Sequence, residues 1–259
     1  SAPRAALAAA LALCLQVGVN FANDYSDGVR GTDDHRVGPQ RLVGSGAAAP
    51  GRVRAVAFCC FGVSGLAGLA AVAVTGHWWL LAVGVACVLA AWFYTGGRHP
   101  YGYLGLGEVF VFIFFGLVAT AGTDYLLCGH VSAAGWAAAV AMGLTADGVL
   151  VTNNLRDIAS DTAAGKRTLE TRLGDRASRL LYAGLVVAVA VCCVLVAALS
   201  TWWALLGLLG AALLVPAART ILGGAVGLRL VSTLRSTSMG ELVLSLGLLA
   251  GVAVARLTA

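Results

Sequence analysis

The chain opens with a long apolar run, AALAAALALCLQVGV (residues 5–19), and passes within a few residues into NDYSDGVRGTDDHRVGPQRL (residues 23–42). The second stretch holds four aspartates and three arginines, although only 11% of the 259 residues are charged. With its flanks, the apolar run is long enough to form a helix that crosses about 30 Å of hydrocarbon. Charges of both signs therefore gather where a membrane-spanning helix ends.

Further apolar stretches of similar length follow along the chain, in which 59% of the residues are hydrophobic. An α-helix satisfies all of its backbone hydrogen bonds internally, as a segment surrounded by lipid must. We therefore predict an all-α polytopic membrane protein with eight transmembrane helices. The predicted spans are 4–22, 54–75, 78–95, 106–122, 132–152, 178–199, 202–220 and 239–257.

The basic residues predict the orientation in the membrane. Nearly all of the 17 lysines and arginines fall in loops on one side, and only Arg4 and Arg256 lie on the other. The positive-inside rule makes the arginine-rich side cytoplasmic. This topology accounts for the net charge of +5, so the charge gives no reason to expect a nucleic-acid partner.

The charged stretch has a second copy further along the chain. GVNFANDYSDG, from Gly18, aligns with GVLVTNNLRDI, from Gly148, and four identical residues coincide at an offset of 130. Each copy carries Asn-x-x-x-Asp where a membrane helix reaches the cytoplasmic side, as Asn23 and Asp27 or as Asn153 and Asp157. Residues four apart share one helix face. The repeat predicts two pseudo-repeats, about 1–130 and 131–259, in a single transmembrane domain spanning 1–259.

The two copies present a cluster of carboxylates. The second copy adds Asp161 one turn on, where the first has Gly31, with Asp33 and Asp34 just beyond. Carboxylates held close together repel one another unless a cation lies between them. Oxygen ligands of this kind suit Mg²⁺, which proteins usually hold with a few carboxylates and substrate phosphates. Nearby basic residues can neutralise a diphosphate; they are Arg30, Arg98, Arg156, Lys166 and Arg167.

Three stretches carry a resemblance to a known family. NDYSDGVRGTDDHRVGPQRLV (23–43) and NNLRDIASDTAAGKRTLETRLG (153–174) resemble the two aspartate-rich motifs of UbiA-type intramembrane prenyltransferases. Together with YTGGRHPYGYLGLGEVFVFIFFG (94–116), they are most similar to the branch that prenylates 1,4-dihydroxy-2-naphthoate in menaquinone synthesis. The resemblance covers residues 18–174, and beyond Leu180 only the hydropathy matches.

The resemblance implies a UbiA-like helical bundle around a central cavity. That family has nine helices, so the first one is expected to be missing before residue 1. The two motifs would bind Mg²⁺, or Mn²⁺ in its place, and the diphosphate of a polyprenyl donor. The implied catalytic residues are Asp27, Asp157, Asp161 and Lys166. The implied metal ligands are Asp24, Asp27, Asp33, Asp157 and Asp161. The implied substrate-binding residues are Asn23, Asn153, Asn154, Arg156, Arg98, Tyr94 and Arg30.

The implied reaction transfers a polyprenyl group from polyprenyl diphosphate to 1,4-dihydroxy-2-naphthoate, with loss of carbon dioxide and diphosphate. Its partners are these two substrates and membrane lipid, and the product is a demethylmenaquinol. Two alternatives stay open at this point. One is a related prenyltransferase with another aromatic acceptor, such as hydroxybenzoate or homogentisate. The other is a cation-coupled membrane transporter, a class in which repeats and intramembrane acids also occur.

Two further acids lie outside the motifs. Glu108 begins the fourth predicted span, where a carboxylate either caps the helix N-terminus or contributes to function. Asp147 lies within the fifth span, about 15 Å further into the membrane than Asp157 at 1.5 Å per residue. Carboxylates at such a depth are usually functional, but the resemblance assigns Asp147 no role.

Overall fold

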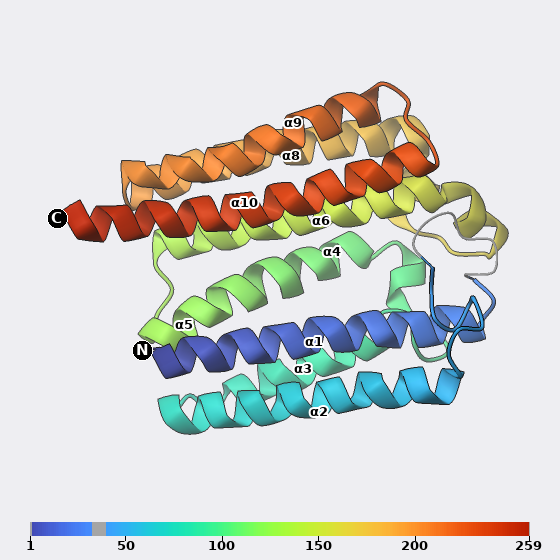
Figure 1. The fold of residues 1–259 in the computed structure, drawn as a ribbon, viewed down its shortest axis with the longest axis horizontal. Coiled ribbons are helices and arrows are strands. Elements are labelled where there is room, and N and C mark those ends of the chain that lie inside the picture. The colour runs from blue at the N-terminus through green and yellow to red at the C-terminus, as the bar shows by residue number, and fades with distance from the viewer. Residues whose placement is uncertain (1, 33–39, 259) are drawn as a thin grey trace. The chain divides into compact units, whose positions relative to one another are not determined.

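The computed structural model describes residues 2–32 and 40–258, and every regular element in them is a helix (Figure 1). The predicted all-α class is therefore confirmed. The elements are α1 (Ala2–Val29), α2 (Pro50–Thr75), α3 (Leu80–Phe93), η1 (Tyr101–Leu104), α4 (Gly107–Val111), η2 (Phe112–Ala121), α5 (Gly122–Cys128), α6 (Ala133–Ala163), α7 (Leu169–Leu173), α8 (Asp175–Leu199), η3 (Trp202–Gly207), α9 (Leu208–Leu222) and α10 (Leu228–Thr258).

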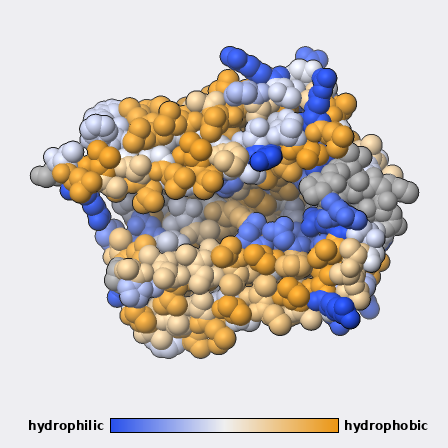
Figure 2. Space-filling model, in the orientation of Figure 1, coloured by the Kyte–Doolittle hydropathy of each residue, from blue (hydrophilic) through white to orange (hydrophobic). Residues whose placement is uncertain are grey.

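The helices have the length and composition of membrane spans. Among the described residues, seven helical segments are long and apolar enough to cross a membrane, and α3 is a shorter apolar helix. Each of the eight predicted spans coincides with one of these segments. Hydrophobic side chains cover much of the helix surface (Figure 2). The prediction of a multi-pass membrane protein is thus confirmed, whereas a central cavity and a missing first helix stay predictions.

The chain divides into two compact units. The first comprises residues 1–107, 123–130 and 160–168. In it α1, α2 and α3 pack side by side (Figure 1). Small side chains allow the helices to pack closely: Ala22 of α1 and Ala57 of α2 are fully buried beside Phe61. The hydroxyl of Ser64 on α2 donates to the Leu11 carbonyl of α1 at 3.0 Å, which satisfies a polar group inside the unit.

The second unit comprises residues 108–122, 131–159 and 169–259. Here α8, α9 and η3 pack together, and α10 packs on α9 and η3. A buried hydrogen bond of 2.7 Å joins the Tyr182 hydroxyl on α8 to the Thr237 hydroxyl on α10. Helix α6 contributes to both units, since residues 131–159 belong to the second and residues 160–163 to the first. The single transmembrane domain spanning residues 1–259 stays a prediction.

Several helices extend beyond their predicted spans. The first span was predicted at 4–22, but α1 continues to Val29. The span at 132–152 is the apolar part of α6, which continues to Ala163. The last span was predicted at 239–257, but α10 begins at Leu228. Arg229 and Arg235 lower the hydropathy of the first turns of α10, so a hydropathy criterion excludes residues that are helical. In each case the helix extends beyond its apolar segment, and the first residues of both motifs consequently lie on helices.

A tight contact in the second unit is testable. Gly116 of η2 packs on α6 so closely that a Cβ atom there would lie 2.5 Å from the Gly143 Cα. We expect Gly116→Ala to lower the free energy of unfolding by about 1–3 kcal/mol, because backbone atoms would have to move apart. Thermal unfolding in detergent measures this loss. Gly122→Ala is the matched control, since a Cβ atom at Gly122 meets nothing within 4 Å. Equal midpoints for the two variants would contradict the close approach.

Candidate active site

The start of the first motif, residues 23–29, forms the last two turns of α1. Gly31 adopts the left-handed conformation, with φ at 72°, just beyond the helix. The Thr32 amide donates to the Asp27 carbonyl at 3.0 Å, and the Gly31 amide donates to the Gly28 carbonyl at 3.2 Å. This pair of bonds is the Schellman arrangement that ends a helix at glycine. Asp27 is therefore the third residue from the helix end.

The end of α6 repeats this arrangement. Gly165 has φ at 74°. The Lys166 amide donates to the Asp161 carbonyl at 2.8 Å, and the Gly165 amide donates to the Thr162 carbonyl at 3.2 Å. Asp161 is thus the third residue from its helix end, as Asp27 is from the end of α1. The reversed turn directs the chain back along the helix, so the Lys166 side chain reaches Asp161.

The two helix ends meet within the first unit. The Lys166 Nζ lies 3.6 Å from the Asp27 Oδ2 and 3.8 Å from the Asp161 Oδ1. Both aspartates are more than nine-tenths buried. Each stands at a helix C-terminus, where the backbone carbonyls already carry partial negative charge. Two carboxylates in such a place require a cation, and Lys166 supplies one. The structure therefore brings together three residues that the sequence predicted to be catalytic.

This geometry corrects the register of the repeat. Aligned by sequence, Asp27 corresponds to Asp157, but aligned by helix end it corresponds to Asp161, at an offset of 134 residues. The physical reason is Gly31, which stands where the second motif has Asp161 and ends α1 one turn earlier. The last aspartate on α1, Asp27, and the last aspartate on α6, Asp161, therefore lie at the same number of residues from their helix ends.

Tyr103, which the sequence analysis did not single out, joins this cluster from η1. Its hydroxyl donates to the Asp27 Oδ1 at 2.6 Å and lies 3.2 Å from the Thr32 hydroxyl. Its ring centroid lies 4.6 Å from the Lys166 Nζ. Burial raises the pKa of the Tyr103 phenol above its usual value, and the charge of Asp27 raises this pKa further. Tyr103 is thus a neutral hydrogen-bond donor at neutral pH.

Asp24 has a separate role in the first motif. Its two carboxylate oxygens accept hydrogen bonds from the Leu42 and Val43 amides, each at 2.9 Å. Asp24 therefore fixes the chain that leads from the motif toward α2, and its role as a metal ligand stays a prediction. Asp33, another predicted metal ligand, lies outside the described residues.

Asn23 and Arg30 attach the loop after α3 to the end of α1. The Thr95 hydroxyl donates to the Asn23 side-chain oxygen at 2.9 Å. The Arg30 guanidinium donates to the Thr95 and Gly97 carbonyls. These contacts give both residues a structural use, and their predicted contact with substrate is not tested by them.

Tyr94 and Arg98 belong to the same loop. The Tyr94 ring makes an edge contact with the Tyr101 ring, with 5.5 Å between centroids. The Arg98 side chain is exposed, and no ion pair or hydrogen bond of its side chain is found within residues 2–32 and 40–258. Its predicted position over the aspartate cluster is not established by any contact, and it stays a prediction.

In the second unit, Arg156 organises the second motif. Its Nε and Nη2 donate to the two carboxylate oxygens of Asp157 at 2.7 and 2.5 Å, and Nη2 also donates to the Asn153 side chain at 2.7 Å. The Arg156 side chain is almost fully buried. Its Nη1 is buried without a hydrogen-bond partner in the described part of the chain. A buried donor of this kind calls for an explanation, and an anionic ligand supplies one.

Further acids lie behind the second motif in the same unit. The Asn154 amide donates to the Glu108 Oε1 at 3.1 Å. Glu170 of α7, which the sequence analysis also missed, is fully buried and lies close enough to Glu108 for their charges to interact. Asp147 is buried two turns before Asn154 on the same face of α6, and its Oδ1 has no partner among the described residues. Glu108 therefore belongs to a buried cluster of polar side chains, with Asn154 and Glu170, and is more than a helix cap.

The donor set fits a magnesium ion in part. Within the described residues, no group of three or more His, Cys, Asp or Glu side chains is placed to hold a metal ion. Asp27 and Asp161 nevertheless turn carboxylate oxygens toward a common cation, the Lys166 ammonium. Mg²⁺ in proteins is commonly bound by one or two carboxylates, with water and substrate phosphates completing its octahedron. Two converging aspartates are consistent with such a site.

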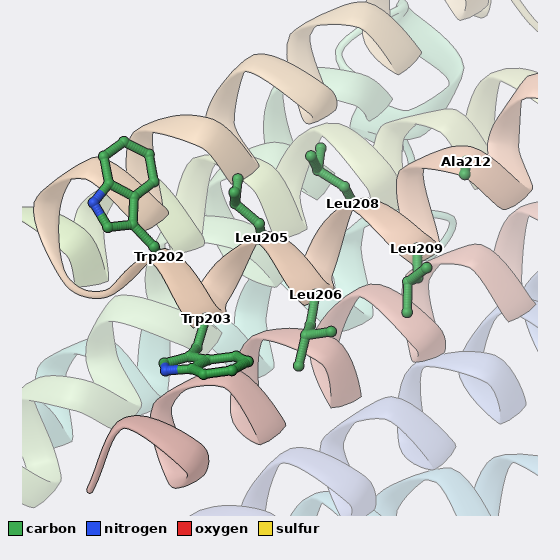
Figure 3. A pocket seen from close by; sticks show the side chains of 7 residues that line it. All are labelled: Trp202, Trp203, Leu205, Leu206, Leu208, Leu209 and Ala212. Atoms are coloured by element: carbon green, nitrogen blue, oxygen red, sulfur yellow. The ribbon is translucent and has the colours of Figure 1, made fainter. Parts of the chain in front are cut away.

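An apolar groove of about 460 Å³ lies elsewhere, on η3 and the start of α9 (Figure 3). Trp202, Trp203 and Leu209 in its wall are exposed. It carries no charged side chain and cannot support the chemistry of the motifs. Exposed tryptophans on a membrane protein are typical of the lipid–water interface.

Comparison with known proteins identifies relatives. The sequence model of the UbiA prenyltransferase family matches residues 1–225. The 1,4-dihydroxy-2-naphthoate octaprenyltransferase of Mycobacterium tuberculosis is 48% identical over 255 residues, which are 98% of this chain and 87% of the relative. The protein of that name from Escherichia coli is 37% identical over 256 residues, covering 96% of this chain and 83% of the relative.

A solved structure has the same fold. It is described as "Structural and mechanistic insights into the biosynthesis of Digeranylgeranylglyceryl phosphate synthase in membranes", with a TM-score of 0.64 and 15% identity. The match covers 97% of this chain and 86% of that chain. Together with the family match, this confirms the resemblance and the fold class predicted from the two motifs.

Glu170 makes the stability of the protein depend on pH. Burial raises the pKa of Glu170 above its ordinary value of 4.5, and the charge of Glu108 raises it further. The folded state then binds a proton that the unfolded state releases, so the stability is highest below pH 4.5 and falls as pH rises through the neutral range. The slope can reach about 1.4 kcal/mol per pH unit.

Glu170→Gln should remove this slope and leave the fold intact, because the amide is neutral at every pH and similar in shape. Thermal unfolding midpoints in detergent between about pH 5 and 8 measure the effect. Asp175→Asn is the control, since the Asp175 side chain is largely exposed and its loss should leave the slope unchanged. A glutamine variant with the slope of the wild type would show that Glu170 is ionised in the folded protein.

Proposed function

The chain belongs to the UbiA prenyltransferase family, and we propose that it transfers a polyprenyl group from polyprenyl diphosphate to 1,4-dihydroxy-2-naphthoate. Carbon dioxide and diphosphate leave, and the product is a demethylmenaquinol for menaquinone biosynthesis. The observation that carries the proposal is the convergence of Asp27 and Asp161 on Lys166. The choice of acceptor is supported by the near full-length similarity to prenyltransferases of that name.

The chain's own residues supply the charge that a departing diphosphate needs. Lys166 lies at the helix ends with its ammonium between two carboxylates and available to a phosphate oxygen. In the second motif, the buried Nη1 of Arg156 is a second donor of charge-assisted hydrogen bonds. As the bond between the allylic carbon and oxygen breaks, negative charge grows on the diphosphate. Fixed cations therefore stabilise the transition state more than the bound substrate.

Asp27 and Asp161 are the residues that would hold Mg²⁺, with Asp24, Asp33 and Asp157 as further predicted ligands. When bound, the metal ion supplies Lewis-acid stabilisation to the diphosphate oxygens. The side chains of Asp27 and Asp161 are buried at helix ends, so few water molecules compete with phosphate for the cations that they hold.

The membrane helices supply the environment for the second half of the reaction. The allylic fragment left by diphosphate departure is a carbocation-like electrophile, which water would quench. The electron-rich naphthoate ring attacks it, and its carboxylate leaves as carbon dioxide. Apolar helices exclude water and hold the prenyl tail in lipid. We further propose that the motifs face the cytoplasm of a bacterial cell, in accord with the arginine-rich loops on their side.

The proposed donor chemistry predicts a metal requirement. Turnover of radiolabelled polyprenyl diphosphate with 1,4-dihydroxy-2-naphthoate in detergent should fall at least about 100-fold in excess EDTA. Added Mg²⁺ or Mn²⁺ should restore it, because the carboxylates alone repel the diphosphate. Formation of the prenylated quinol, identified by chromatography, tests the reaction itself. Full turnover in the presence of the chelator would refute the metal requirement.

The helix-end aspartates should be necessary for the reaction. Asp27→Asn and Asp161→Asn each remove a charge next to Lys166 while preserving shape, and each should lower kcat about 100-fold. Asp175→Asn is the control, because Asp175 pairs with Arg179 at the start of α8 and is largely exposed. It should keep the wild-type rate. Wild-type rates in both helix-end variants would mean that the repeated motif is only architectural.

A further inference from the structure

Tyr103 connects the two helix ends that carry the helix-end aspartates. Its hydroxyl contacts Asp27 and Thr32 at the end of α1. Its carbonyl accepts a hydrogen bond of 3.0 Å from the Arg167 amide, just past the end of α6. Its ring lies beside the Lys166 ammonium. All of these contacts lie within the first unit. One residue of η1 therefore touches the end of α1, the segment after α6 and the cation between them.

The hydroxyl contacts have a defined direction. A carboxylate can only accept, so the Tyr103 hydroxyl donates its proton to the Asp27 Oδ1 at 2.6 Å. The Thr32 hydroxyl, at 3.2 Å, then donates to the Tyr103 oxygen. The hydrogen bond from Tyr103 occupies the Oδ1 atom of Asp27. The other carboxylate oxygen, Oδ2, is the one that faces Lys166.

The ring contact explains why Lys166 does not close onto the acids. Charge-assisted N–H···O bonds usually measure about 2.7–2.9 Å. The Lys166 Nζ lies farther than this from both the Asp27 and the Asp161 oxygens, at 3.6 and 3.8 Å. It lies 4.6 Å from the Tyr103 ring centroid, within the range of a cation–π interaction. The ring attracts the ammonium and competes with the carboxylates for it.

We propose that Tyr103 is a positioning residue for the donor diphosphate. Its ring holds the Lys166 ammonium apart from the two aspartates, where a phosphate oxygen can reach it, and its hydroxyl fixes the Asp27 carboxylate. Without the ring, Lys166 would form a short ion pair with Asp27 or Asp161, and a diphosphate would have to break that pair. This inference rests on the proposed function, because it assumes a diphosphate donor.

The test separates the ring from the hydroxyl. Tyr103→Phe keeps the ring and removes the hydrogen bond to Asp27, whereas Tyr103→Leu removes both. Each is combined with Lys166→Met. The first readout is the Kd of inorganic pyrophosphate with Mg²⁺, measured by calorimetry on the full chain in detergent. The second is the pair of KM and kcat values for the prenyl diphosphate donor. Tyr101→Phe is the matched control, since its hydroxyl donates to the Ala90 carbonyl outside the cluster.

The cost of removing the ring is the ratio of the pyrophosphate Kd of Y103L to that of Y103F. With Lys166 in place, we expect this ratio to be about 10. In the Lys166→Met background the ratio should be less than about 2, since the ring acts through the ammonium. Y103F alone should lower kcat about 10-fold by releasing Asp27. The KM for the aromatic acceptor should stay unchanged in every variant, and Y101F should match the wild type.

Equal costs of ring removal in the two backgrounds would overturn the proposal, as would a Y103F variant with wild-type kcat. Y103F is nearly isosteric, so it keeps the hydroxyl role testable even if Y103L does not fold. A failure of the proposed function gives a different result from a failure of the Tyr103 proposal. If the wild type neither binds pyrophosphate with Mg²⁺ nor consumes the donor, the diphosphate site is refuted and the role of Tyr103 with it. If the wild type does both and only the coupling is absent, the Tyr103 role alone is refuted.

Discussion

The site depends on an electrostatic conflict between the ends of two helices. The carboxyl ends of α1 and α6 both carry partial negative charge from the helix dipole, and each holds a buried aspartate in its last turn. Such ends repel each other, and they can lie together only around positive charge. Lys166 provides this charge from the residue that follows the helix-ending glycine. A place that holds an internal cation near two carboxylates is also suited to a metal ion and the diphosphate that accompanies it.

The helix ends are defined by glycine rather than by hydropathy. Gly31 and Gly165 take up left-handed conformations that residues with a Cβ atom rarely adopt, and each ends its helix in a Schellman turn. This fixes Asp27 and Asp161 at equal distances from their helix ends. The duplicated sequence motif has one register and the duplicated structure another, because Gly31 replaces an acid and shortens the first copy by one turn. In the structural register, a carboxylate stands at each helix end.

The sequence was sufficient to predict the fold class, and three of its predicted site residues lie together in the structure. Apolar segments of membrane length predicted eight spans; seven of them correspond to helical segments long and apolar enough to cross a membrane, and the third to the shorter apolar helix α3. The motif spacing predicted that Asp27, Asp161 and Lys166 serve one site. It could not reveal Tyr103, because its contact with Asp27 joins residues 76 positions apart through a short 3₁₀ turn, and no local pattern encodes such a meeting. The amide contacts of Asp24 and the burial of Glu170 escaped prediction for a similar reason. Bonds from a carboxylate to backbone amides, and the burial of a short helix, depend on tertiary packing.

The placement of the two opposite charges on one short segment has a further consequence. Asp161 and Lys166 are five residues apart, and the Schellman turn between them brings the ammonium back to the carboxylate of its own helix end. The positive charge therefore arrives with the negative one whenever this segment folds, and the aspartates need no ligand to be tolerated in the protein interior. A strong ion pair would satisfy that need equally well, but it would leave neither partner available for substrate. The distances of 3.6 and 3.8 Å, with an aromatic ring on the cation, instead describe a lysine ammonium that lies near both carboxylates without a short ion pair to either of them. A site that must accept a highly charged diphosphate from water, and release it again, requires this intermediate condition.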